Sequence, residues 1–228
     1  MTIFFVGDPH NRFEEIIQAI DAHRPEAVIL LGDMTVDVPL HDALQHVVNI
    51  TDVWWIHGNH DCDEERWYEH LFESQLADRN LNGRVAEIGG LRIAGLGGVF
   101  RGRFWHPNYE MRWHTRDEYL RQAGKGNRWR GGLPLKARCA IWWEDYDRLS
   151  RQHADILVTH EAPGCHHHGF GIIDDLARSM EVRTIYHGHH HRDYTAEIEG
   201  GITVRGVGLA GITDEHGNII LCGLESEY

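Results

Sequence analysis

The sequence predicts an α/β fold in which short buried strands alternate with amphipathic helices. Apolar runs of four or five residues recur over 3–6, 27–31, 53–56 and 155–159, as expected of strands inside a sheet. Between several of them, apolar residues recur at helical spacing. Polar clusters of Asp, Asn and His follow the ends of apolar runs, which places candidate functional side chains at strand ends.

The first half of the chain supplies most of the predicted helices. After the strand over 3–6, apolar residues from Phe13 to Ile20 fall on one helical face, with polar residues opposite. Strands are then expected over 27–31 and 53–56, and helices over 40–48 and 63–73. Strands over 84–88 and 91–96 flank Gly89-Gly90, a pair typical of a hairpin turn.

The second half ends in β meanders. A helix is predicted over 139–151, a strand over 155–159 and a second helix over 172–180. Short strands follow over 184–187, 194–198, 202–206 and 218–222. The pattern as a whole is α/β.

Composition indicates one domain over residues 1–228, because a chain of 228 residues can bury one sizeable core. A formal charge of −13 argues against nonspecific nucleic-acid binding by the whole surface. No signal peptide or membrane span is expected. Widely spaced cysteines without a C-x-x-C pair predict reduced thiols in a cytoplasmic protein: Cys62, Cys139, Cys165 and Cys222.

Five polar clusters follow apolar runs in a fixed order. They are Asp8-Pro9-His10, Gly32-Asp33, Gly58-Asn59-His60-Asp61, Thr159-His160-Glu161 and Gly188-His189-His190-His191. Carboxylate, imidazole and carboxamide together suit divalent transition metals, and no cysteine takes part. The clusters therefore predict a metal site where several strand ends converge.

In this order the clusters resemble the motifs of the calcineurin-like metallophosphoesterase superfamily, especially its small bacterial phosphoesterases and phosphodiesterases. The resemblance runs from residue 8 to residue 191. It implies two mixed β-sheets packed face to face with flanking helices, a four-layer αββα sandwich. It also implies a hydrolase that attacks phosphoester bonds with a metal-bridging hydroxide.

The resemblance assigns seven ligands to two divalent metal ions. Asp33 would bridge the ions, while Asp8, His10 and His191 complete one shell and Asn59, His160 and His189 the other. Mn²⁺ is the expected metal, and Fe, Zn, Co and Ni also suit these ligands. In an extended segment His189 and His191 point the same way, which leaves His190 as a bystander.

His60 is the predicted catalytic residue, facing the substrate and able to protonate the leaving oxygen. Phosphoprotein phosphatases of the superfamily carry an acid at the position of Val36 and an arginine at that of His57. These departures disfavour a phosphoprotein substrate and leave open which acid orients His60. For Asp61, capping the following helix is preferred over orienting the Asn59-His60 turn.

Segment 99–138 departs from the pattern. It contains ten basic and three acidic residues, a local charge of +7, together with Trp105, Trp113 and Trp129. One interpretation is an insertion that serves as a lid or substrate-contacting arm, since arginine binds phosphate and aromatic rings stack on bases. The other is a solvated segment whose arginines pair with the acidic body, or an oligomer contact. Composition alone favours neither.

The leading functional hypothesis is a phosphatase or phosphodiesterase acting on a small-molecule or nucleotide substrate. A nuclease acting on DNA or RNA is the alternative, because segment 99–138 is basic and aromatic. A non-catalytic metal-binding interaction module is the third. No membrane partner is expected, and the oligomeric state stays open.

Overall fold

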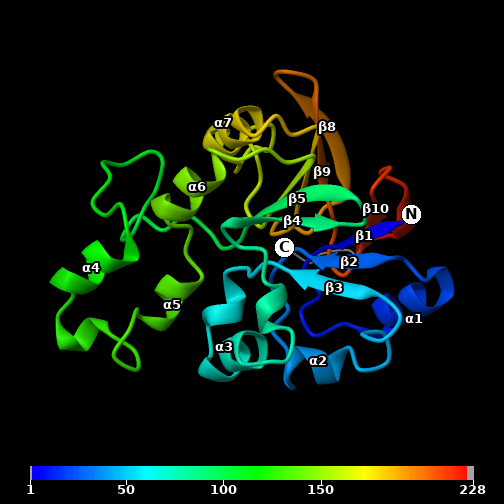
Figure 1. Cartoon of the computed structure of the whole chain (residues 1–228), viewed down its shortest axis with the longest axis horizontal. Coiled ribbons are helices and arrows are strands. Elements are labelled where there is room, and N and C mark those ends of the chain that lie inside the picture. Colours follow the sequence, from blue (N-terminus) through cyan, green and yellow to red (C-terminus); the bar gives the residue numbers. More distant parts are fainter. Residues whose placement is uncertain (1, 225–228) are drawn as a thin grey trace.

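Two mixed β-sheets stack face to face in the computed structural model, which describes residues 2–224, and helices cover their outer faces (Figure 1). One sheet has the strand order β11-β10-β1-β2-β3 and the other β4-β5-β6-β7-β9-β8. The strands are β1 (Ile3–Val6), β2 (Ala27–Leu30), β3 (Asp52–Trp55), β4 (Arg84–Ile88), β5 (Leu91–Leu96), β6 (Ile156–Thr159), β7 (Thr184–His187), β8 (Tyr194–Ile198), β9 (Ile202–Gly206), β10 (Ile212–Asp214) and β11 (Ile219–Leu221). The predicted αββα architecture is confirmed.

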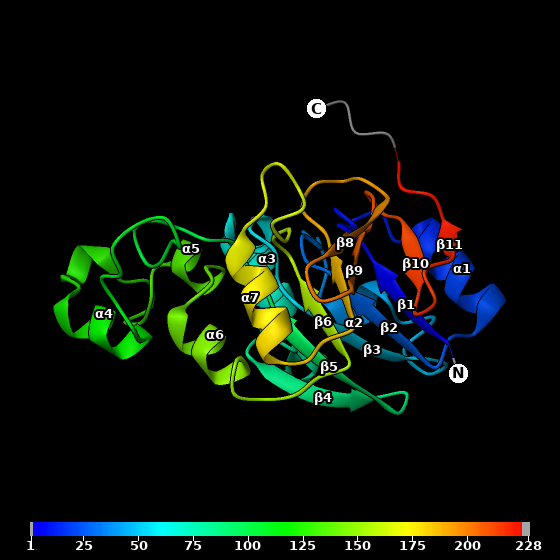
Figure 2. The ribbon, with the colours of Figure 1, turned by 90° about the horizontal axis from the view of Figure 1, so that it is seen from above.

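Helices pack on the outer face of each sheet. The α-helices are α1 (Glu14–His23), α2 (Leu40–Ala43), α3 (Glu65–Phe72), α4 (Arg116–Gln122), α5 (Leu135–Arg138), α6 (Trp143–Leu149) and α7 (Gly171–Ser179). Short 3-10 turns are η1 (His60–Cys62), η2 (Ala77–Arg79) and η3 (Lys125–Asn127). In the views of Figures 1 and 2, α1, α2 and α3 flank the first sheet, and α6 and α7 flank the second.

The core between the sheets explains why the central strands are apolar throughout. Side chains alternate along a strand, so Ile3 and Phe5 face the second sheet while Phe4 and Val6 pack against the helices. The ring of Phe5 stacks on that of Tyr186 across the sheets, with centroids 3.7 Å apart. In the sequence, a strand buried on both faces is a continuous apolar run and not an alternation of apolar and polar residues.

Parallel pairing brings the polar clusters to one edge. β1, β2 and β3 run parallel, as do β5, β6, β7 and β9. The carboxyl ends of β1, β2 and β3 therefore lie together in one sheet, and those of β6 and β7 in the other. This is where the five clusters begin.

Outside segment 99–138, three elements differ most from the prediction. The helix expected over 40–48 ends at Ala43, and turns follow it. The helix expected over 139–151 begins only at Trp143, since the chain before it enters the core through Ile141 and Trp142. Strand β10 went unpredicted: it has only three residues, and its antiparallel pairing with β1 is a long-range contact.

Segment 99–138 projects from one end of the molecule beside α3 and α6 (Figure 2). It contains α4, η3 and α5. With the residues just after it, the segment forms a small apolar cluster of its own, which includes Phe104, Tyr119 and Trp142. Amphipathic spacing was not evident there because its helices have four to seven residues.

A disulfide joins Cys62 to Cys139, and both residues are fully buried. The prediction of reduced thiols is therefore wrong for this pair. The two cysteines are 77 residues apart in sequence, and only the fold brings them together. Cys165 and Cys222 are free and exposed.

Within residues 2–224, no helix has the length and apolar character needed to cross a membrane.

Candidate metal centre

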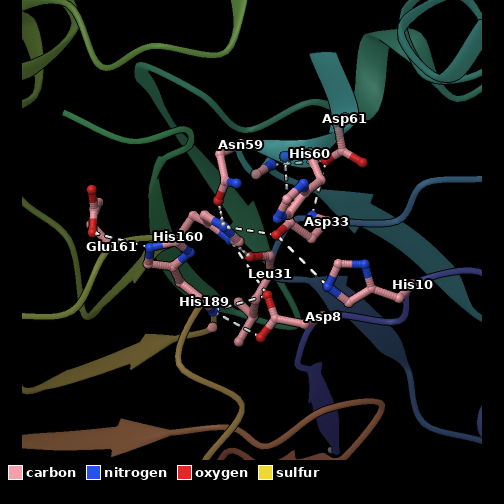
Figure 3. A network of polar contacts seen from close by, with 12 residues as sticks. Asp8, His10, Leu31, Asp33, Asn59, His60, Asp61, His160, Glu161 and His189 are labelled. Carbon is pink, nitrogen blue, oxygen red and sulfur yellow. Dashed lines mark hydrogen bonds and ion pairs between the residues drawn. The ribbon is translucent and has the colours of Figure 1, made fainter. Parts of the chain in front are cut away.

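The seven predicted ligands come from loops that follow five different strands. Asp8 and His10 follow β1, Asp33 follows β2 and Asn59 follows β3. From the second sheet, His160 follows β6, and His189 and His191 follow β7. Figure 3 shows side chains from both sheets pointing toward one another between the sheets. The predicted convergence of strand ends is what the structure contains.

Asp33 stands between two groups of donor atoms. Its Oδ2 lies 3.9 Å from His10 Nε2 and 3.4 Å from His160 Nε2. On one side, His10 Nε2 and His191 Nε2 are 3.3 Å apart. On the other, Asn59 Oδ1 lies 3.1 Å from His160 Nε2. A single carboxylate oxygen is thus shared by two sets of nitrogen and oxygen donors.

Asp8 and His189 are linked to each other and to these groups. Both carboxylate oxygens of Asp8 accept the backbone N–H of His189, at 2.9 and 2.8 Å. Asp8 Oδ1 also lies 3.7 Å from His160 Nδ1. Ligand atoms of Asp33, His160 and His189 lie within 4.8 Å of one another, a spacing that one ion can bridge. The donor set fits divalent transition metals.

The ring of His160 is oriented by the backbone. Its Nδ1 donates a hydrogen bond of 2.8 Å to the carbonyl of Leu31. This leaves Nε2 directed at Asp33 and Asn59. A histidine whose second nitrogen is held by a backbone carbonyl is typical of metal ligands.

Burial and charge act in opposite directions at the centre. Burial opposes ionisation of Asp33, but attraction to His160 and hydrogen bonds outweigh it and hold the pKa of Asp33 below its ordinary value. Burial raises the pKa of Asp8 to about 8 and is only partly offset by His160. Burial disfavours charge on His160 as well, yet Asp33 and Asp8 raise its pKa to about 10. The ionised carboxylate of Asp33 therefore attracts positive charge to this point.

The other imidazoles are in the form that binds metals. Burial lowers the pKa of His10 to about 4 and that of His189 to about 2. Both rings are neutral near pH 7, and neutral imidazole is the metal-binding state.

Five of the seven predicted ligands have left-handed backbone conformations. The φ angles are 39° at Asp8, 42° at His10, 52° at Asp33, 71° at His189 and 54° at His191. Such values are uncommon outside glycine, although Asp and His adopt them more readily than most residues. The glycines of the motifs are needed for close approach: a Cβ on Gly58 would lie 2.2 Å from Asp33 Oδ1.

Asp61 is a structural link, and the preferred prediction that it caps a helix is wrong. Its carboxylate accepts the backbone N–H groups of Asp33, Thr35 and Gly58, at 2.8 to 3.0 Å. Neither η1 nor α3 has a side-chain cap. Asp61 therefore ties the loop after β2 to the loop after β3.

His60 lies beside the metal centre with its side chain 48% exposed. Its backbone N–H donates to Asp33 Oδ1 at 2.8 Å, which fixes the main chain next to the shared carboxylate. The ring centroid is 5.7 Å from that of His10. His60, His10, His189 and His191 line a cavity of about 1250 Å³. This position allows His60 to reach a bound substrate.

Other residues near the motifs separate into two groups. His57 is buried, packs near Phe72 and does not line the cavity. Glu161 is also buried, accepts the backbone N–H of Phe100 and lies 3.8 Å from His189 Nε2. The loop over 166–168 does line the cavity. His190 stacks on His166 with centroids 4.0 Å apart, and its nitrogen comes within 4.8 Å of Glu161 and His189.

Six of the ten cations of segment 99–138 make hydrogen bonds or ion pairs within the protein, and three of these six pair with acids outside the segment. Arg130 pairs with three acids spaced four apart, Glu65 and Glu69 on α3 and Glu73 just after it. Arg116 pairs with Glu144 and Asp145. These contacts favour the interpretation in which the segment pairs with the acidic body.

Comparison with known proteins agrees with this geometry. Residues 1–193 match the family model described as calcineurin-like phosphoesterase. An uncharacterized protein of Haemophilus influenzae is 38% identical over 219 residues, and the match covers 96% of each chain.

Solved structures share the fold at low sequence identity. A dimetal phosphatase from Danio rerio aligns with a TM-score of 0.57 at 12% identity, over 98% of each chain. A phosphopantetheinyl hydrolase from Mycobacterium tuberculosis aligns with a TM-score of 0.57 at 16% identity, over 92% of this chain and 90% of that one. Both share the two-sheet architecture.

Proposed function

The chain belongs to the calcineurin-like phosphoesterase family and is a metal-dependent phosphoester hydrolase, and we propose that it is a dinuclear enzyme for small-molecule or nucleotide phosphoesters. The supporting observation is the shared oxygen of Asp33, at 3.9 Å from His10 Nε2 and 3.4 Å from His160 Nε2. A carboxylate in this position can hold two cations close together. His10, His191 and Asp8 would complete one shell, and Asn59, His160 and His189 the other.

Two divalent ions, when bound, would neutralise phosphate charge and lower the pKa of a coordinated water. The protein's own part is to hold the phosphoester beside His60. That imidazole is exposed to the cavity, and its backbone is fixed by Asp33. It would donate a proton to the leaving oxygen as the phosphorus–oxygen bond breaks.

A small substrate is supported over nucleic acid. A nuclease would need free cations to neutralise successive phosphates. Arg116 and Arg130 are paired with acids of the body and Arg128 donates to backbone carbonyls, which leaves fewer of the segment's ten cations for phosphates. The cavity of about 1250 Å³ at the metal centre is large enough for a nucleotide.

We propose Mn²⁺ as the physiological metal, because the mixed imidazole and carboxylate set accepts it. The cytoplasmic location stays a prediction, and the buried disulfide weighs against it because disulfides are rare in reducing compartments.

Hydrolysis of p-nitrophenyl phosphate and bis(p-nitrophenyl) phosphate by the Mn²⁺-loaded protein tests this function. The wild type should hydrolyse at least one of them. Asp33→Asn should lower kcat by about 10²-fold or more, because it removes the shared ligand. His60→Ala should lower kcat by as much on phenyl phosphate, whose strongly basic leaving oxygen needs the acid. His153→Ala, at an exposed histidine paired with Glu181, is the matched control and should keep full activity. Equal activity in all four proteins would contradict the proposal.

A further inference from the structure

One acid contacts the ring of His60, and it lies outside the five motifs. Asp63 follows His60 by one turn, and its backbone N–H donates to the His60 carbonyl at 3.0 Å. Its Oδ2 lies 2.7 Å from His60 Nδ1. Among the ion pairs of residues 2–224, no other carboxylate contacts this ring.

Neighbouring acids are committed elsewhere. The carboxylate of Asp61 is buried and accepts three backbone N–H groups. Glu64 accepts from Arg66 Nε at 2.7 Å. Asp37 also pairs with Arg66, at 3.3 Å. Among these neighbouring acids, Asp63 is therefore the one that contacts the ring of His60.

The other oxygen of Asp63 contacts segment 99–138. Its Oδ1 lies 3.2 Å from Nζ of Lys136, which is on α5. The disulfide between Cys62 and Cys139 joins the residue before Asp63 to the residue after α5. Two different links thus connect this end of the segment to the turn that carries His60.

We propose that Asp63 is the positioning residue for His60, and that segment 99–138 holds Asp63 in place through Lys136 and the Cys62–Cys139 disulfide. The inference rests on the proposed hydrolysis. Asp63 accepts the Nδ1–H of His60 and so directs Nε2 into the cavity.

The step that Asp63 supports is departure of the leaving group. A water releases a proton to solvent, and the resulting hydroxide oxygen bonds to phosphorus while the bond from phosphorus to the leaving oxygen breaks. The electron pair of that bond goes to the leaving oxygen, which takes the proton from His60 Nε2. A tilted ring would place that proton wrongly, and the loss is largest when the leaving oxygen is strongly basic.

Leaving-group dependence tests this role in the Mn²⁺-loaded enzyme. Asp63→Asn should lower kcat by about 10²-fold on phenyl phosphate, a poor leaving group, and by under about fivefold on p-nitrophenyl phosphate. KM should change little, because Asp63 does not touch the substrate. Glu64→Gln is the matched control and should behave as the wild type. Equal losses on the two substrates, or no loss, would overturn the role.

A double variant gives an independent check. If Asp63 acts through His60, Asp63→Asn should have little further effect in the His60→Ala background. If the losses in kcat of the two single variants multiply in the double variant, Asp63 acts by another route. A wild type inactive on these monoesters and on the corresponding diesters, diphenyl phosphate and bis(p-nitrophenyl) phosphate, would instead refute the proposed function, so the two failures are distinguishable.

Lys136→Gln tests the contribution of the segment. It should lower kcat on phenyl phosphate by about threefold, a modest effect because the pair is partly exposed. Arg130→Gln removes a cation of the same segment that pairs with α3 and not with Asp63, and it should leave kcat unchanged. If Lys136→Gln and Arg130→Gln have the same kcat on phenyl phosphate, Lys136 does not hold Asp63 in place.

Discussion

At the scale of single residues, the metal centre combines strained backbone with dense hydrogen bonding. Asp8, Asp33 and His189 have left-handed φ angles and buried or partly buried side chains. Such conformations cost on the order of 1–3 kcal/mol each and persist where surrounding contacts enforce them. At Asp33 the enforcing contact comes from Asp61, which accepts its backbone N–H at 2.9 Å.

Replacing Asp61 by alanine should destabilise the protein by about 4 kcal/mol, because three buried N–H groups lose a charged acceptor. Urea denaturation measures the change in the free energy of unfolding. Glu64→Ala, at an exposed acid nearby, should change it by less than about 0.5 kcal/mol. If Asp61→Ala unfolds at the same urea concentration as the wild type, the stability of the loops after β2 and β3 does not depend on Asp61.

The resemblance of the five motifs to the family was sufficient to single out seven residues that the fold brings together, and their binding of metal stays a prediction. The resemblance was not sufficient to assign Asp61 and Asp63. Both acids follow His60 within three residues, and either could cap a helix or orient a ring. Their roles differ because Asp61 points into the protein toward the loop after β2, whereas Asp63 remains partly exposed beside His60.

At the scale of elements, the strands were more predictable than the links between distant segments. The hairpin of β4 and β5 has the predicted bounds, since Gly89-Gly90 sits between two apolar runs. The disulfide could not be predicted, because Cys62 and Cys139 meet only once α5 packs beside η1. The acids that pair with Arg130 are visible in the sequence as a row spaced four apart, Glu65 and Glu69 on α3 and Glu73 just after it.

Removing the disulfide should lower the free energy of unfolding by about 4 kcal/mol, because it closes a loop of 77 residues in the unfolded chain. Guanidinium unfolding of Cys62→Ser/Cys139→Ser against the wild type measures this. A Cys165→Ser/Cys222→Ser variant, at the two free cysteines, should match the wild type. An unchanged midpoint in the first variant would mean that the bond is not formed in solution.

At the scale of the whole molecule, the metal centre exists only because two sheets meet at one edge. Asp8, Asp33 and Asn59 come from the first sheet, and His160 and His189 from the second. The motif order indicated this convergence, whereas the pairing of β7 with β9 and of β1 with β10 depends on long-range packing. The charge contrast of segment 99–138 was evident in the sequence, and of its acidic partners only the row of Glu65, Glu69 and Glu73 left a signal there.

The most direct test of the central claim is the number of metal ions that each chain binds. Mn²⁺-loaded protein, freed of unbound ion and measured by mass spectrometry of the metal, should contain about two ions per chain. Asp33→Asn should lose most of both, because both shells share that oxygen, whereas His190→Ala should retain two. One ion per wild-type chain, or two ions in Asp33→Asn, would contradict the dinuclear account.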